Sequence, residues 1–404
     1  MHGLQGAGVI QPALLKLELA VRGARLDSSV SLPRSIEPIR SLDLLLPGDV
    51  WVDVPIDERR AAGSPFLLLA DERHHVLVRR QENGGDALRT DVRALPRPRF
   101  AERRTSRGIP MAQIATTRGS HLVVTLGGSC GFSVRGAPCR FCVEGARASL
   151  DDDAPPVGDV VEVVRAAFDE VACTSVYFNS AHFDGDDGGV AFLTPYVEAV
   201  RRHFDTLVAL QVHPPRSDRW IDHTYAMGVD ALSYNLEIFD ADILNRHCIG
   251  RSRYVGRERY LDALAYAARI FPSGTVWTDL ALGIEPADST IAGIDALVAT
   301  GVVPVAAILR GDYAMPDVAE ATRVLAYLYR AVRRQGLSMG WVRGLGLGIT
   351  PMEARHFAGD GARLTATVHQ LARSRIGALA ARGLARARRR LRVRKADDAE
   401  AAHS

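Results

Sequence analysis

The chain has 404 residues and a formal net charge of +3, and 47% of its residues are hydrophobic and 24% charged. These proportions are typical of a globular protein, and the length suits one large domain with a smaller one, or two domains of ordinary size. No uncharged apolar run reaches about 18 residues and the N-terminus lacks the segments of a secretion signal, so the sequence excludes a helix across a bilayer and predicts a cytoplasmic protein.

Residues 1–115 carry short apolar runs at 50–54, 66–69 and 75–78, separated by glycine, proline and charged residues. This pattern predicts a small α+β or β-rich domain, and we favour α+β. The stretch 95–100, Leu-Pro-Arg-Pro-Arg-Phe, reads as the connection to the next domain.

From His121 the pattern changes to strand-like apolar runs that alternate with helix-length segments. The six runs lie at 122–126, 175–179, 207–212, 231–238, 276–284 and 302–309. Six successive βα units predict an α/β fold with a parallel sheet and right-handed crossovers, curled as an open barrel or doubly wound. We place this core at 116–315 and expect ligands at the C-terminal ends of its strands.

Three of the five cysteines, Cys130, Cys139 and Cys142, lie within thirteen residues, directly after the first of these strands. The spacing Cys-x8-Cys-x2-Cys, in a loop with several glycines, suits the wrapping of a small inorganic group. A structural zinc ion usually has four ligands, and no fourth cysteine or histidine lies at the usual zinc spacing. A thioredoxin-like pair would leave Cys130 without a role. The spacing favours a [4Fe-4S] cluster on three cysteines, with one iron open for chemistry.

Other candidate residues lie near the predicted strand ends. His182, Asp184 and His213 follow the second and third strands and face the expected pocket, either as substrate residues or as hydrogen-bonded structural side chains. Cys173 precedes a strand and Cys248 follows the fourth strand; we interpret both as packing residues.

Beyond residue 315 we expect a helical extension to residue 404, with a helix at 318–334 and the glycine-rich run 344–348 as a structural turn. Between Arg363 and Lys395 there are eleven basic residues and no acidic one. This segment suits an acidic partner or nucleic acid, or it is a solvated helix that frays toward its end. We favour the helix and do not expect nucleic acid as a partner.

The cysteine loop resembles that of the radical SAM superfamily, in which the cluster loop follows the first strand of a partial (β/α)6 barrel. The usual spacing there is Cys-x3-Cys-x2-Cys, so the longer first spacing is a departure. Phe141 occupies the aromatic position before the last cysteine and is implied to lie beside the adenine. The resemblance implies two cofactors: a [4Fe-4S] cluster on Cys130, Cys139 and Cys142, and S-adenosylmethionine (SAM).

The fourth strand carries a second similarity. Its segment 233–240, Ser-Tyr-Asn-Leu-Glu-Ile-Phe-Asp, is similar to a segment of biotin synthase that binds the SAM ribose, which implies that role for Asn235 and Glu237. A carboxylate that accepts bonds from a cis-diol is sound chemistry in itself. The family uses a basic residue nearby for the methionine carboxylate, and Arg259 is the first choice here, with Arg253 second.

The remaining cofactor contacts are implied by the other strands. Gly283 and Glu285 belong to a segment similar to the fifth-strand segment that passes the adenine, and Pro304 fits the sixth-strand adenine contact. Many family members hold the SAM amino group with a Gly-Gly-Glu-Pro-like segment after the second strand. Asn179 and Ser180 stand in its place.

A narrower resemblance covers residues 60–310. The stretch 105–111, Thr-Ser-Arg-Gly-Ile-Pro-Met, and the residues from there to Cys142, with Ser-Pro-Phe at 64–66, are similar to a poorly characterised radical SAM group from bacterial gene clusters that contain a nitrilase.

The resemblance implies that a reduced flavodoxin or ferredoxin supplies an electron, that SAM is cleaved to a 5′-deoxyadenosyl radical, and that the radical abstracts hydrogen from a small-molecule substrate. One alternative is a radical SAM methyltransferase. Another is a non-catalytic protein that binds zinc through its cysteines and nucleic acid through its arginine-rich tail. The sequence shows no cobalamin-domain signature.

Overall fold

The computed structural model describes residues 11–32, 39–57, 61–70, 74–80, 85–127, 130–142, 154–309, 316–342, 348–359 and 374–401. The N-terminal part forms a six-stranded sheet in the order β1-β4-β5-β6-β2-β3. The strands are β1 (Arg25–Leu26), β2 (Ser41–Leu46), β3 (Val50–Pro55), β4 (Phe66–Ala70), β5 (His75–Arg80) and β6 (Asp86–Ala94). With α1 (Pro12–Arg22) against β3, this is the α+β unit that the sequence predicts.

A second sheet of eight strands follows, and its spatial order matches the order along the chain from β7 to β14. The strands are β7 (Ala115–Arg118), β8 (His121–Thr125), β9 (Ser175–Asn179), β10 (Leu207–Val212), β11 (Ala231–Tyr234), β12 (Val276–Ala281), β13 (Val303–Ala307) and β14 (Gly348–Ile349). The six strands from β8 to β13 pair in parallel, and β7 and β14 flank them in antiparallel pairs.

Helices connect the parallel strands. They are α6 (Val157–Glu170), α7 (Val190–His203), α8 (Arg219–Ala226), α9 (Ala241–His247), α10 (Arg257–Ile270) and α11 (Ala287–Ala299), and α12 (Val318–Arg334) follows β13. Shorter elements are η1 (Pro47–Asp49), η2 (Arg99–Glu102), α3 (Met111–Ile114), α4 (Gly131–Val134), η3 (Arg251–Val255) and α13 (Pro351–Ala354).

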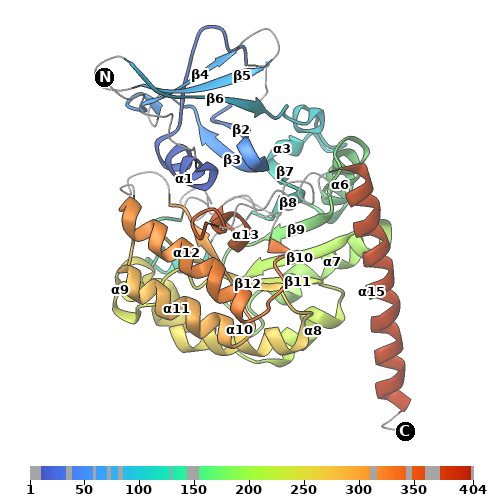
Figure 1. Ribbon diagram of the computed structural model, residues 1–404. Coiled ribbons are helices and arrows are strands. Elements are labelled where there is room, and N and C mark those ends of the chain that lie inside the picture. The colour runs from blue at the N-terminus through green and yellow to red at the C-terminus, as the bar shows by residue number, and fades with distance from the viewer. Residues whose placement is uncertain are drawn as a thin grey trace.

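The sequential strand order decides between the two architectures left open by the sequence. A doubly wound sheet reverses its strand order and carries helices on both faces, whereas unreversed right-handed crossovers put every helix on one face. The other face then curls inward. Tyr177, Ala209, Ala231, Trp277 and Val303 form a buried apolar cluster of their own on that inner face, separate from the core under the helices. The fold is therefore a partial (β/α)6 barrel, as predicted (Figure 1).

Buried polar contacts fasten the N-terminal unit to the barrel. Lys16 of α1 lies 2.8 Å from the carboxylate of Glu353 in α13, and both side chains are almost fully buried. Arg118 at the end of β7 lies 2.9 Å from Asp53 in β3. The division into domains at residues 115 and 315 stays a prediction; β14, which lies beyond 315 in sequence, joins the edge of the barrel sheet.

The arginine-rich tail forms helix α15 (Arg375–Ala401), which runs along the outside of the barrel (Figure 1). Ala378 and Ala385 are buried, and Arg386 pairs with Asp205 at 2.8 Å. The first half of the helix is thus docked. Most of the glycine-rich run, residues 344–347, lies outside the described residues. Within the described part of the chain, no helix is both long and apolar enough to cross a membrane.

Candidate functional site

The cysteine loop leaves the C-terminal end of β8. Cys130 precedes α4, and the chain then turns back so that Cys139 and Cys142 occupy a tight turn, with the Cys142 amide donating to the Cys139 carbonyl at 3.2 Å. The Arg140 amide donates to the His247 carbonyl at 2.9 Å. The loop is therefore held against the segment that follows β11, at the barrel end where ligands of parallel α/β folds bind.

Two glycines make this close approach possible. A Cβ at Gly131 would lie 2.9 Å from Nδ1 of His182, and a Cβ at Gly250 would lie 2.5 Å from Cγ of Phe132. The Phe132 ring stacks on His182 with centroids 3.9 Å apart and meets His213 edge-on at 5.0 Å. The loop is packed on its inner side by rings, so its backbone path is fixed.

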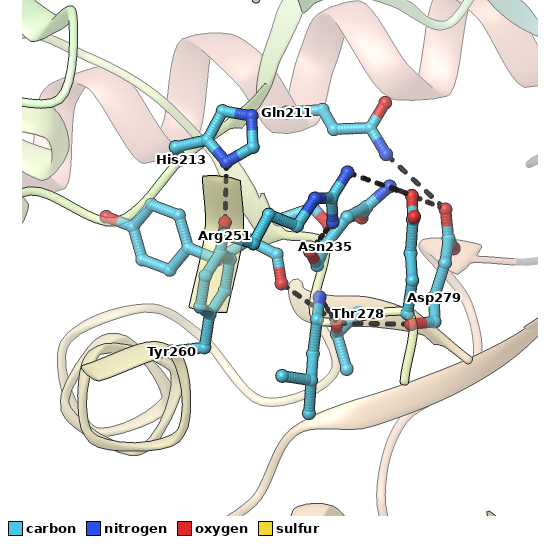
Figure 2. A network of polar contacts seen from close by, with 11 residues as sticks. Gln211, His213, Asn235, Arg251, Tyr260, Thr278 and Asp279 are labelled. Carbon is cyan, nitrogen blue, oxygen red and sulfur yellow. Dashed lines mark hydrogen bonds and ion pairs between the residues drawn. The ribbon is translucent and has the colours of Figure 1, made fainter. Parts of the chain in front are cut away.

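A polar network occupies the neighbouring strand ends (Figure 2). Nδ2 of Asn235 donates to Oδ2 of Asp279 at 2.9 Å, and Nε2 of Gln211 donates to the same oxygen at 3.4 Å. Asn235 also lies 3.5 Å from Oε1 of Glu237, and Ser233 donates to Oδ1 of Asn235 at 2.8 Å. The two residues assigned to the ribose by sequence, Asn235 and Glu237, are therefore neighbours.

Arg251 is the cation of this network. Its Nη2 lies 3.3 Å from Oε1 of Glu237, and its Nη1 donates to the carbonyl of Asn235. Burial alone would lower the pKa of Arg251, but the charges of Glu237 and Cys139 hold it well above its ordinary value. Glu237 has φ of 65°, the one positive φ outside glycine among the described residues. Such a conformation costs about 1–3 kcal/mol and clusters at functional sites.

Burial shifts the pKa of several other groups here. It raises the pKa of Asp279 to about 7, with a further contribution from the charge of Glu237. It lowers the pKa of His182 to about 4 and that of His213 well below its ordinary value. Nδ1 of His213 lies 2.6 Å from the hydroxyl of Tyr260. At neutral pH both imidazoles are uncharged.

One thiol of the cysteine loop, that of Cys139, lies near the cation of Arg251. A hydrogen bond with Cys248 lowers the pKa of Cys139 to about 6, burial opposes this, and the charge of Arg251 adds to it. Cys139 therefore favours the thiolate, the form in which cysteine binds metals. Cys173 is buried, as predicted, and burial raises its pKa to about 12.

Among the described residues, the buried polar atoms without a hydrogen-bond partner include Oγ of Ser180, Oε2 of Glu237 and Nε of Arg251 at this end of the barrel. Buried polar groups are nearly always paired, because leaving one unpaired costs about 1–3 kcal/mol. The open acceptor of Glu237 and the open donor of Arg251 belong to one ion pair, and such open atoms suit a polar ligand.

Other predicted residues take varied places. Asn179 ends β9 and pairs in the sheet with Thr125 and Gln211. Gly283 follows β12 with φ of 80°, which glycine adopts readily. Asp184 binds Arg135 at 2.8 Å beside the cysteine loop.

Three predicted residues lie apart from the network. The carboxylate of Glu285 accepts from the amides of Phe239 and Asp240 and from Ser289, at 2.7–3.2 Å, so it orders the loop after β11. Arg259 lies 2.9 Å from Asp218 and donates to the carbonyl of Pro215 at 2.7 Å. Pro304 alternates with the inward-facing Val303 and Val305, so its ring points toward the helices.

Sequence reasoning missed Arg251, Gln211 and Asp279 as members of the site. For Gln211 and Asp279 a signal was available, because each is a polar residue inside an apolar strand. The strands are Leu-Val-Ala-Leu-Gln-Val at 207–212 and Val-Trp-Thr-Asp-Leu-Ala at 276–281. A polar side chain in such a strand needs a partner inside the fold, and here the two residues bind each other.

A cavity inside the barrel adjoins the network. It is lined by Arg118, His121, Val123, Tyr177, Gln211, Trp277, Asp279, Val305, Ala307 and Gly348. Nδ1 of His121 lies 2.5 Å from Oγ of Ser175, and its buried Nε2 has no partner among the described residues. Burial lowers the pKa of His121 to about 4, so it is neutral.

Among the described residues, no three histidine, cysteine, aspartate or glutamate side chains are grouped closely enough to hold a single metal ion. No disulfide joins any of the five cysteines.

No protein-family model matches the chain, and no curated protein matches it in sequence. Solved structures do. The FeFe-hydrogenase maturase HydG from Carboxydothermus hydrogenoformans matches with a TM-score of 0.42 and 12% identity, over 53% of this chain and 52% of that one. Methylornithine synthase PylB matches with a TM-score of 0.41 and 11% identity, over 53% and 64%. This chain thus spans between half and two thirds of the length of these two.

A third solved structure, a radical SAM methyltransferase from Sphaerobacter thermophilus, matches with a TM-score of 0.39 and 12% identity, over 72% of this chain and 83% of that one. Identities this low carry no residue role from one chain to another.

Proposed function

We propose that this protein is a radical SAM enzyme acting on a small molecule. The observation that carries the proposal is the fixed cysteine loop at the carboxyl end of a partial barrel, directly beside a buried network with open hydrogen-bonding atoms on Glu237 and Arg251. Cys130, Cys139 and Cys142 would hold a [4Fe-4S] cluster. In such a cluster each cysteine binds a different iron, so the three thiolates need not converge on one ion.

The donor set fits the cluster. The neighbouring Arg251 and the hydrogen bond with Cys248 favour the thiolate of Cys139. Three cysteines leave one iron free for the amino acid part of SAM. When bound and reduced, the cluster supplies the electron that cleaves SAM, and a flavodoxin or ferredoxin would deliver that electron.

The polar network fits the rest of SAM. Asn235 and the free Oε2 of Glu237 would accept hydrogen bonds from the ribose hydroxyls of SAM. Arg251 suits the methionine carboxylate better than Arg259, because Arg251 lies in the network and acts on Cys139, whereas Arg259 lies apart from it against Asp218 and the carbonyl of Pro215. Asn179 and the unpartnered Oγ of Ser180 would accept hydrogen bonds from the amino group of SAM. The adenine would lie between the backbone at Gly283 and the ring of Phe141.

The interior cavity is the proposed substrate pocket. Its walls include the aromatic rings of Tyr177 and Trp277, His121 is neutral, and Asp53 balances the charge of Arg118. A pocket with balanced charge and aromatic walls favours an uncharged substrate with a flat apolar part. Asp279 and Gln211 would orient its polar end beside the network.

Cofactor loading tests the proposal. The chain, reconstituted anaerobically with iron and sulfide, should bind about four irons per chain. Adding SAM should change the electron paramagnetic resonance spectrum of the reduced cluster. Cys142→Ala should fail to retain the cluster, whereas Cys173→Ala, a buried cysteine away from the loop, should load like the parent. Uptake of zinc and no iron would contradict the proposal.

A further inference from the structure

Cys248 is fully buried at the C-terminal end of α9, and sequence reasoning gave it a packing role. The structure places it directly opposite Cys139 in a short antiparallel bridge. Two backbone hydrogen bonds frame this bridge: the Arg140 amide donates to the His247 carbonyl at 2.9 Å, and the Gly250 amide donates to the Ala137 carbonyl at 3.0 Å. The juxtaposition of these two cysteines is thus fixed by the backbone.

The pattern of these bonds says how the side chains face each other. The bond from Arg140 to His247 joins the residues that flank the pair, so Cys139 and Cys248 are a non-hydrogen-bonded pair of the bridge. In such pairs the Cα atoms are about 4.5 Å apart and the side chains lie closest together. The thiols of Cys139 and Cys248 therefore face each other across the bridge.

The close approach is built into the loop. A Cβ on Gly250 would lie 2.6 Å from the carbonyl oxygen of Ala137, so a larger residue there would push the two segments apart. Cys248 lies on the buried side of the bridge, within the apolar core, whereas Cys139 is partly exposed. Cys248 therefore lies on the core side of Cys139, away from solvent.

We propose that Cys248 is a positioning residue of the cluster, whose thiol donates an S–H···S hydrogen bond to the sulfur of Cys139. This inference rests on the proposed function, because Cys139 must be a cluster ligand. A cysteine that binds iron is a thiolate and has no proton to donate, so the hydrogen of this pair belongs to Cys248. Hydrogen bonds to ligand sulfurs help to set the reduction potential of an iron–sulfur cluster. By withdrawing electron density from the sulfur of Cys139, the hydrogen bond from Cys248 would raise the reduction potential of the cluster.

The first test concerns the pairing itself and needs no cluster. The unloaded full-length chain is treated with diamide, which accepts two hydrogens as two thiols become one disulfide, and is then alkylated and digested with trypsin. Cys130, Cys139, Cys142 and Cys248 fall on four different tryptic peptides, 119–135, 136–140, 141–147 and 247–251. The proposal requires the crosslink between 136–140 and 247–251. Peptide 247–251 recovered only in alkylated form, with Cys139 joined to Cys130 or Cys142, would overturn it.

The second test measures the reduction potential of the loaded protein by a redox titration followed by electron paramagnetic resonance. Cys248→Ala should keep its iron content and shift the potential to a more negative value. Cys248→Ser, which keeps a donor, should lie between that variant and the parent. The matched control Cys173→Ala should leave the potential unchanged.

The outcomes separate the two proposals. If the parent takes up no iron–sulfur cluster, the proposed function fails and the role of Cys248 falls with it. If the parent loads and Cys248→Ala has the parent's potential, only the role of Cys248 is overturned. If Cys248→Ala and Cys248→Ser load with less iron, Cys248 is needed to hold the cluster, and a role confined to its potential is wrong.

Discussion

The guanidinium of Arg251 lies 3.3 Å from the carboxylate of Glu237, with 8% and 14% of the two side chains exposed. This ion pair stands between the cysteine loop and the strand-end network, because Arg251 also donates to the carbonyl of Asn235 and influences the charge state of Cys139. A buried pair is costly to form, and leaving one partner alone is more costly still. Its position therefore suits a ligand site more than a stabilising device.

Arg251→Met should destabilise the fold by about 3–5 kcal/mol, because Glu237 then remains buried without its counter-charge. Urea unfolding followed by circular dichroism measures this. The double variant Arg251→Met with Glu237→Gln should recover most of the loss. Equal stability of the parent and Arg251→Met would show that the pair is solvated in solution.

Asp279→Asn should make stability less dependent on pH. The pKa of Asp279 is raised to about 7 in the folded protein, against 3.8 as its ordinary value, so the folded state holds its proton more tightly. Its contribution is fully present below about pH 4 and is lost as the pH rises to about 7, by up to about 1.4 kcal/mol per pH unit. The difference in unfolding free energy between parent and variant, measured from pH 4 to 8, should follow this course. A constant difference would contradict it.

Gly250→Ala should destabilise the protein by about 1–3 kcal/mol and reduce iron loading, because the added Cβ collides with Phe132 and Ala137 beneath the cysteine loop. The matched control is Gly383→Ala, in the middle of α15, where a Cβ meets nothing within 4 Å. That change should stabilise by about 0.5–1 kcal/mol, since alanine favours a helix. Equal stability and iron loading of the two variants would show that the cysteine loop shifts to make room for the added methyl group.

Trp277→Ala should cost about 3–5 kcal/mol, because this 1%-exposed side chain fills the inner face of the barrel. Trp277→Phe should cost much less, since it keeps a ring in the wall of the cavity. Thermal unfolding compares the two. A loss below about 1 kcal/mol for the alanine variant would mean that the inner face is not packed as described.

Much of the barrel follows from the sequence, because apolar runs at regular spacing leave few arrangements. The predicted runs 175–179 and 207–212 coincide with β9 and β10. The run 231–238 was predicted as one strand, but β11 ends at Tyr234, where the chain departs from regular pairing and Glu237 takes a positive φ. Backbone strain at a single residue has no signature in hydrophobicity.

The arginines show a second limit. Several arginines lie between residues 251 and 259, and their spacing does not say which turns inward. The π-helical turn η3 inserts an extra residue per turn just there, and it leaves Arg251 inside and Arg259 against α8. Cys139 and Cys248 lie opposite each other only because of a bridge between segments more than a hundred residues apart. A local sequence pattern cannot predict such a bridge.

The most direct test of the central claim is the product of SAM cleavage. The reconstituted, dithionite-reduced protein is incubated anaerobically with SAM, and the products are separated by chromatography. The account predicts 5′-deoxyadenosine, formed by the parent and by Cys173→Ala but not by Cys142→Ala. A fully iron-loaded parent that forms neither 5′-deoxyadenosine nor any other product of SAM would contradict it.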